Sequence, residues 1–145
     1  MESILAQIPM FLQLLIATSL GMLIGVERTL AHKTAGLRTY GLVSLGSCLF
    51  VLTALTVGQT MSIDESDVMR VVAGIITGIG FLGAGVIILR EQTAVGLTTA
   101  AGLWVTAGIG VAVGFGLYGL AIATAALTLM TLTVFWYVEH RITPQ

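Results

Sequence analysis

The segment 78–83 has the sequence GIGFLG, which satisfies the G-x-G-x-x-G pattern of loops that hold a dinucleotide pyrophosphate. That chemistry requires a strand before the first glycine, a helix after the last, and a carboxylate about 20 residues further on. Here apolar residues surround the segment, and residues 97–103 contain no carboxylate. We therefore expect these glycines to bind no nucleotide.

Packing between helices explains the glycine spacing better. Residues four and seven apart share one face of a helix, so Gly74, Gly78 and Gly85 line up, and Gly80 lies on the adjoining strip. Small residues let a second helix backbone approach closely in a membrane. An alternative is that the segment 78–85 unwinds and offers its carbonyl groups to a cation. The glycines that we assign to helix packing are Gly21, Gly25, Gly74, Gly78, Gly80, Gly83, Gly85, Gly102 and Gly110.

A second group of candidate residues consists of charges between the long apolar segments. Glu27 and Arg28 end one such segment, and Arg38 begins the next. These side chains are either interfacial anchors that set the topology or, for Glu27 and Arg38, a buried ion pair beside a cavity or a partner surface. A carboxylate at this position could also take part in a cation site.

Acidic residues gather in the next polar link, where Asp67 lies one helical turn before Arg70. This spacing predicts an ion pair at the start of a helix. With one cysteine, two histidines and no charge in the middle of an apolar segment, the sequence offers no catalytic set. We expect no enzyme activity and no cofactor. The net charge of −1 provides no basic footprint for nucleic acid.

These residues must be positioned by membrane-spanning helices. The chain is 57% hydrophobic and 9% charged, against roughly 25% charged residues in a soluble domain. A helical span needs roughly 20 apolar residues, and the charges divide the chain into five such blocks. We predict an all-α, polytopic membrane domain over residues 1–138 and a cytoplasmic tail over 139–145, with no soluble C-terminal domain. The predicted spans are 8–26, 39–57, 71–89, 96–113 and 117–138.

The distribution of basic residues predicts the orientation. With the N-terminus outside, the inner segments contain Arg28, Lys33, Arg38, Arg90 and Arg141, and the outer segments contain only Arg70. Basic residues favour the cytoplasmic side of a membrane. The prediction is N-terminus out and C-terminus in.

With these residues in view, the sequence resembles the MgtC/SapB family of bacterial inner-membrane proteins. The resemblance rests on GVER at 25–28, AGLRT at 35–39, GIGFLGAGVI at 78–87 and VGLTTAAGLWVTAGIG at 95–110. It implies five spans and a place in the bacterial inner membrane. The family is associated with adaptation to low Mg²⁺. It has been named as a candidate Mg²⁺ transporter, and its best-known member is regarded as a regulator of membrane energetics that acts on partner membrane proteins.

The sequence departs from the family pattern at several positions. The virulence-type members have Asn where Thr98 stands and Cys where Val105 stands, so that role is not carried over. Gln is frequent at the position of Gly74, which widens the glycine face here. Many members carry a soluble C-terminal domain, whereas only residues 139–145 follow the last predicted span.

Two functional hypotheses follow from the residues and the resemblance. The first is a non-catalytic membrane regulator whose small-residue faces contact a partner membrane protein or a second copy in a homodimer or higher homo-oligomer. The second is a transporter or channel for Mg²⁺ or another cation. The candidate functional or ion-mouth residues are Glu27, Arg28, Arg38, Asp67, Arg70, Thr98 and Thr99.

Overall fold

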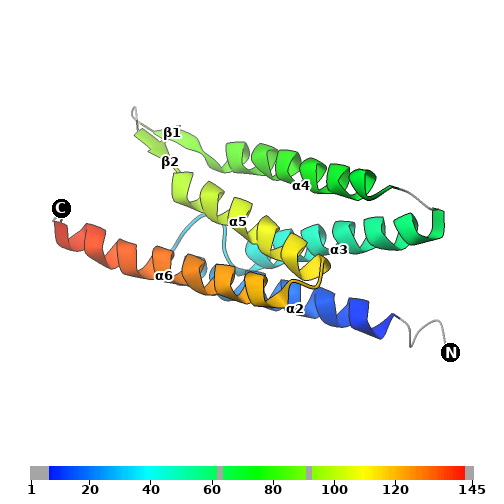
Figure 1. Ribbon diagram of the computed structural model, residues 1–145. Helices are drawn as coiled ribbons and strands as arrows, with labels where there is room; N and C mark the ends of the chain where they lie inside the picture. Colours follow the sequence, from blue (N-terminus) through cyan, green and yellow to red (C-terminus); the bar gives the residue numbers. More distant parts are fainter. Residues whose placement is uncertain (1–6, 62–63, 91–92, 143–145) are drawn as a thin grey trace.

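The computed structural model describes residues 7–61, 64–90 and 93–142. Its helices are long and apolar enough to cross a membrane, which confirms the expected number of five. They are α2 (Ile8–Leu30), α3 (Leu37–Met61), α4 (Glu65–Val86), α5 (Leu97–Gly114) and α6 (Tyr118–Ile142) (Figure 1). The predicted tail after residue 138 therefore begins as helix, because α6 continues to Ile142.

Short-range features fix several of the helix ends. Pro9 lies in the first turn of α2, where its missing N–H has no helical partner to lose. The turn between the fourth and fifth predicted spans joins α5 to α6, and Gly116 adopts a left-handed φ of 74° within it. The amide of Leu117 donates to the Ala112 carbonyl at 2.9 Å, which closes the end of α5. The chain reverses within three residues.

The third span differs from the prediction at its end. Residues 71–89 were expected to be helical, but α4 stops at Val86, and Ile88–Arg90 forms strand β1, paired antiparallel with β2 (Thr93–Val95). The β-branched residues Ile88 and Val95 face each other in this hairpin, and such residues favour a pleated backbone. Helix α4 runs without interruption through the glycines, so the unwinding expected as an alternative at 78–85 is absent.

A glycine sets the start of α5. Gly96 caps the helix at a φ of 96°, and a Cβ there would lie 2.5 Å from the Val86 carbonyl oxygen. A side chain at this position would be strained and would push the hairpin away from the end of α4. Gly96 therefore lets α5 begin directly beside the end of α4.

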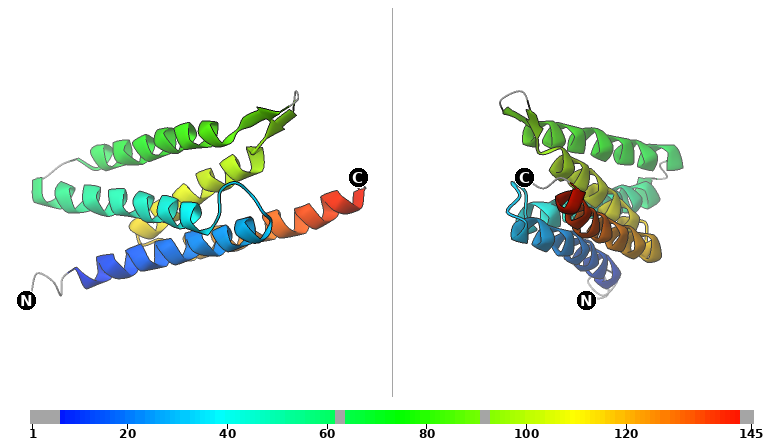
Figure 2. Two further views of the ribbon diagram at one scale, coloured as in Figure 1. Left: turned by 180° about the vertical axis from the view of Figure 1, so that it is seen from behind. Right: turned by 90° about the vertical axis from the view of Figure 1, so that its left-hand side faces the viewer.

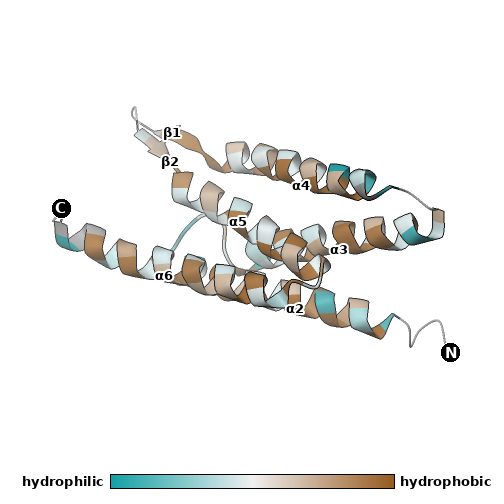
Figure 3. Ribbon diagram, in the orientation of Figure 1, coloured by the Kyte–Doolittle hydropathy of each residue, from teal (hydrophilic) through white to brown (hydrophobic). Residues whose placement is uncertain are grey.

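Helix α5 lies at the centre of the bundle and contacts α2, α3, α4 and α6. It crosses between α4 on one side and α2 and α6 on the other (Figures 1 and 2). The two ends of the chain lie at opposite ends of the bundle, as an odd number of spans requires (Figure 1). Apolar residues cover most of the helix length, and the strongly hydrophilic ones lie mainly toward the helix ends (Figure 3).

Glycines allow close contact between α2, α3 and α5. A Cβ on Gly21 would lie 2.6 Å from the Tyr40 carbonyl oxygen, and a Cβ on Gly25 would lie 2.6 Å from the Leu37 Cα. A Cβ on Gly110 would overlap the Ser44 carbonyl oxygen. Because lipid tails are as apolar as the side chains, such close van der Waals packing stabilises helix contacts in a membrane.

Candidate functional site

A pocket of about 570 Å³ lies at the end of the bundle where α2 ends, α5 begins and α6 passes. Its walls combine basic and hydroxyl side chains with apolar ones. The lining residues are Arg28, His32, Lys33, Thr34, Ala94, Val95, Gly96, Leu97, Thr98, Thr99, Thr131, Leu132, Phe135 and Trp136. We call this cavity the basic-end pocket.

Arg28 contributes a charged side chain to the wall of the basic-end pocket. Its residue surface is only 2% exposed, and its Nη2 donates to Glu27 Oε1 at 2.6 Å while its Nε donates to Glu27 Oε2. This two-point contact is the strong geometry of a guanidinium–carboxylate pair. Arg28 is therefore a buried group that is paired with its neighbour Glu27.

The end of α2 places the next two basic residues at the same pocket. The Lys33 amide donates to the Arg28 carbonyl at 3.0 Å and the His32 amide donates to the Thr29 carbonyl at 3.1 Å. These are the bonds of a Schellman motif, and His32 takes its left-handed position with a φ of 54°. The motif ends α2 and holds His32 and Lys33 at the pocket wall.

Thr98 and Thr99 enter the pocket from the first turn of α5. Thr98 is exposed and Thr99 is 3% exposed. The Thr99 carbonyl accepts a hydrogen bond of 3.2 Å from the Tyr40 hydroxyl, which ties α5 to α3. Three of the predicted candidates, Arg28, Thr98 and Thr99, therefore lie together in one cavity.

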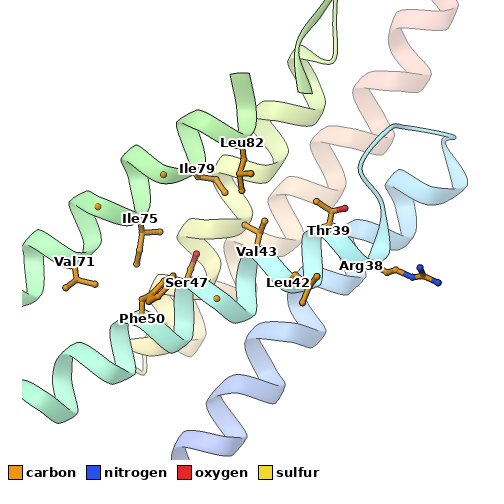
Figure 4. Close-up of a pocket in the computed structure, with 13 residues that line it drawn as sticks. Arg38, Thr39, Leu42, Val43, Ser47, Phe50, Val71, Ile75, Ile79 and Leu82 are labelled. Atoms are coloured by element: carbon orange, nitrogen blue, oxygen red, sulfur yellow. The ribbon is translucent and has the colours of Figure 1, made fainter. Parts of the chain in front are cut away.

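Arg38 lies in a different cavity from Arg28. It is exposed at the start of α3 and lines a groove of about 800 Å³ between α3 and α4. In Figure 4 the side chains of Val43 and Ser47 point from α3 toward Ile75 and Ile79 on α4, and the Arg38 side chain extends away from α4. The expected ion pair between Glu27 and Arg38 is wrong, because Glu27 pairs with its neighbour Arg28.

Asp67 and Arg70 lie in the first turns of α4 and line neither cavity. The Arg70 Nη1 donates to Asp67 Oδ1 at 3.2 Å, which confirms the predicted ion pair. Both side chains are largely exposed, so the pair contributes little to stability. Its place at the opposite end of the bundle separates it from the basic-end pocket (Figure 1).

The glycines assigned to packing fall into two sets. Gly21, Gly25, Gly102 and Gly110 lie at close contacts between α2, α3 and α5. On α4, a Cβ added at Gly83 would make an ordinary contact of 3.6 Å with the Ala100 side chain. The remaining α4 glycines, at which an added Cβ would meet no atom within 4 Å among the described residues, are Gly74, Gly78, Gly80 and Gly85.

Some polar residues inside the spans, among them Gln13 and Tyr40, were not among the predicted candidates. Gln13 of α2 donates from Nε2 to the Val113 carbonyl at 2.9 Å, where α5 ends. Tyr40 is fully buried beside Gly102 and Thr99. The contact of Gln13 could have been predicted from the sequence, since Gln13 is a strongly polar side chain inside an apolar segment.

Basic and hydroxyl side chains set the polar character of the described part of the basic-end pocket. Within residues 7–61, 64–90 and 93–142, no three His, Cys, Asp or Glu side chains come close enough to hold a metal ion. The described lining of the basic-end pocket carries basic groups and hydroxyls. Such a lining attracts anions and disfavours an approaching cation.

Comparison with known proteins connects this bundle to a family. The model of the MgtC family matches residues 14–141. YhiD of Escherichia coli (strain K12), named as a candidate magnesium transporter, is 42% identical over 122 residues, which are 82% of this chain and 57% of that protein. MgtC of Salmonella typhimurium (strain LT2) is 44% identical over 99 residues, which are 68% of this chain and 40% of that protein.

A more distant relative comes from another group of bacteria. SapB of Bacillus subtilis (strain 168) is 37% identical over 139 residues, covering 92% of this chain and 59% of that protein. The chain thus spans about half the length of the curated relatives it matches. No solved structure matches it.

Proposed function

The chain belongs to the MgtC family, and we propose that it is a non-catalytic membrane regulator linked to magnesium limitation, acting by packing against partner membrane proteins. The family resemblance supplies the link to magnesium. The proposal includes residence in the bacterial inner membrane with the N-terminus outside and the C-terminus inside, which the distribution of basic residues supports.

One observation carries the proposal: α4 has a helix face that no described residue covers. Ile79 and Gly83 are the buried residues among those of α4 whose exposure is described. Gly74, Gly78 and Gly85 on this helix have open space where a Cβ would lie. A face of small residues allows a second helix backbone to approach closely in a membrane. We infer that a partner membrane protein, or a second copy of this chain, packs here.

The interior of the bundle supports a regulator more than a cation carrier. Contacts between α2, α3 and α5 are too close to admit a single methyl group at Gly21, Gly102 or Gly110. The carboxylate of Glu27, next to the pocket residue Arg28, is already engaged by that guanidinium. Ion carriers depend on ionisable groups that face the bundle interior or a water-filled cavity.

The alternative function is transport of Mg²⁺ or another cation. It is favoured by the name of the Escherichia coli relative and by the position of Glu27 at one end of the bundle. In this alternative the Glu27 carboxylate must release Arg28 and bind the cation while the cation crosses the membrane.

Flux measurements in proteoliposomes separate the two functions. Purified protein would be reconstituted and assayed for Mg²⁺ and monovalent cation entry, with Glu27→Gln as the site variant and Asp67→Asn as the matched control at the other end. The regulator predicts flux equal to that of empty liposomes for all three proteins. Saturable Mg²⁺ flux that Glu27→Gln abolishes and Asp67→Asn retains would establish the transporter instead.

A further inference from the structure

The basic-end pocket has the composition of an anion site between membrane helices. Arg28, His32 and Lys33 supply nitrogen donors, and the described residues of its lining include no carboxylate. On the other side, Leu132, Phe135 and Trp136 of α6 supply an apolar wall. Basic pockets between transmembrane helices bind anionic lipid headgroups in this way, because the charge meets the phosphate and the apolar wall meets the start of the acyl chain.

The first turn of α5 adds further donors to the same cavity. The first hydrogen bond of this helix runs from the Ala100 amide to the Gly96 carbonyl at 2.9 Å. The amides of residues 97–99 therefore have no acceptor within the helix. Gly96 has no side chain with which to cap them. The helix dipole also places partial positive charge at this point.

An independent observation comes from Thr99. It is 3% exposed and lines the pocket, yet its hydroxyl has no hydrogen-bond partner among the described residues. Other threonines in these helices donate to the carbonyl four residues back, as Thr106 does to Gly102 at 2.8 Å. For Thr99 the residue four back is Val95, which belongs to strand β2. The Thr99 hydroxyl is therefore free to donate a hydrogen bond to a ligand oxygen in the pocket.

The Glu27–Arg28 pair leaves capacity for such a ligand. Nε and Nη2 of Arg28 are bound by Glu27, and Nη1 has no acceptor among the described residues. An incoming oxyanion can accept from Nη1 without breaking the pair. Lys33 then provides a full positive charge that no described residue neutralises.

We propose that the basic-end pocket binds a phosphate oxyanion, held by Arg28, Lys33, Thr99 and the first amides of α5. The phosphate is either the headgroup of an anionic phospholipid, whose acyl chain lies along α6, or free inorganic phosphate. This site does not include the α4 face. The test of anion binding and the test of the proposed regulatory contact are therefore independent of each other.

Calorimetric titration of the purified full chain in non-ionic detergent tests the site. The probes are dihexanoyl phosphatidylglycerol, dihexanoyl phosphatidylcholine and inorganic phosphate. Saturable binding of phosphatidylglycerol but not of the other two identifies a lipid site. Saturable binding of inorganic phosphate that competes with phosphatidylglycerol identifies free phosphate as the ligand. Absence of saturable binding by both anions would overturn the proposal.

Variants test whether the binding occurs in this pocket. Lys33→Gln removes a charge from an exposed residue, and we expect it to weaken anion binding about fivefold, as for one basic group near a phosphate. Thr99→Val keeps the side-chain shape and removes the hydroxyl, with a loss of similar size. Arg38→Gln is the matched control, because Arg38 lies at the same end of the bundle but outside the pocket. Equal weakening by Arg38→Gln and Lys33→Gln, or no weakening by either pocket variant, would refute the assignment.

Discussion

Helices α4 and α5 contain similar numbers of small residues but occupy opposite environments. Ten of the 18 residues of α5 are buried, and this helix contacts all four of the others. Of the α4 residues whose exposure is described, Ile79 and Gly83 are the buried ones. Gly110 of α5 fits against the Ser44 backbone, whereas Gly78 of α4 has no neighbour within 4 Å of an added Cβ.

This difference shows that a small-residue stripe specifies close approach but not which helix approaches. In α5 the approaching backbones belong to the same chain, and the resulting contacts stabilise the bundle. In α4 the same residue type lies on a face where an added Cβ meets no described atom within 4 Å. The predictions below test whether α5 is the structural helix and α4 the functional one.

The largest effect is expected at Gly110. In Gly110→Leu the new side chain would overlap the Ser44 backbone, and we expect destabilisation of about 3 kcal/mol or more. Gly108→Leu is the matched control on the same helix, because an added Cβ at Gly108 meets nothing within 4 Å. Thermal unfolding in detergent provides the comparison, and equal melting temperatures would contradict the role assigned to α5.

A double-mutant cycle at Gly102 and Tyr40 tests the same contact in more detail. A Cβ on Gly102 would lie 2.5 Å from the Tyr40 hydroxyl oxygen, so Gly102→Ala should cost about 1–3 kcal/mol. In a Tyr40→Phe background that oxygen is gone, and Gly102→Ala should cost less than half as much. Additive losses in chemical unfolding would show that the two residues do not meet.

A smaller effect is expected where α2 contacts the end of α5. Gln13→Leu removes the hydrogen bonds from Gln13 to the carbonyls of Val113 and Gly114. Polar contacts between membrane helices contribute about 0.6 kcal/mol on average, so the melting temperature should fall slightly. Ser19→Ala is the control, since the Ser19 hydroxyl bonds only within its own helix. A larger loss for Ser19→Ala than for Gln13→Leu would contradict the contact.

The smallest effect is expected from the exposed ion pair of α4. Asp67→Asn removes the partner of Arg70, and surface pairs of this kind contribute less than about 1 kcal/mol. We expect no resolvable change in melting temperature at moderate salt. A loss as large as that of Gly102→Ala would mean that the start of α4 is held more firmly than its exposure indicates.

Charge spacing predicted the five helices because each span must be apolar over the full membrane thickness. The same signal could not predict strands β1 and β2, since three-residue strands carry no periodicity and the first two positions of β1 are as apolar as the helix before them. Helix α4 therefore ended three residues earlier than the predicted limit of residue 89.

The candidate site was predicted in part. Arg28, Thr98 and Thr99 were selected, and they lie in one pocket. The alternative of an ion pair between Glu27 and Arg38 is wrong, because the adjacent Arg28 reaches the same carboxylate on the helix. The division between closed and open glycines could not be predicted, because spacing along one helix contains no information on which neighbours cover it.

The most direct test of the account uses Gly78→Leu, with Gly119→Leu of α6 as control, because both glycines are exposed and an added Cβ at either meets nothing within 4 Å. Each variant would be expressed in a bacterial host that lacks its own member of the family. Its melting temperature and the growth of the host at limiting Mg²⁺ would be measured. The account predicts wild-type stability for both variants, with growth lost in Gly78→Leu and retained in Gly119→Leu. Wild-type growth with Gly78→Leu would contradict a functional role for the α4 face.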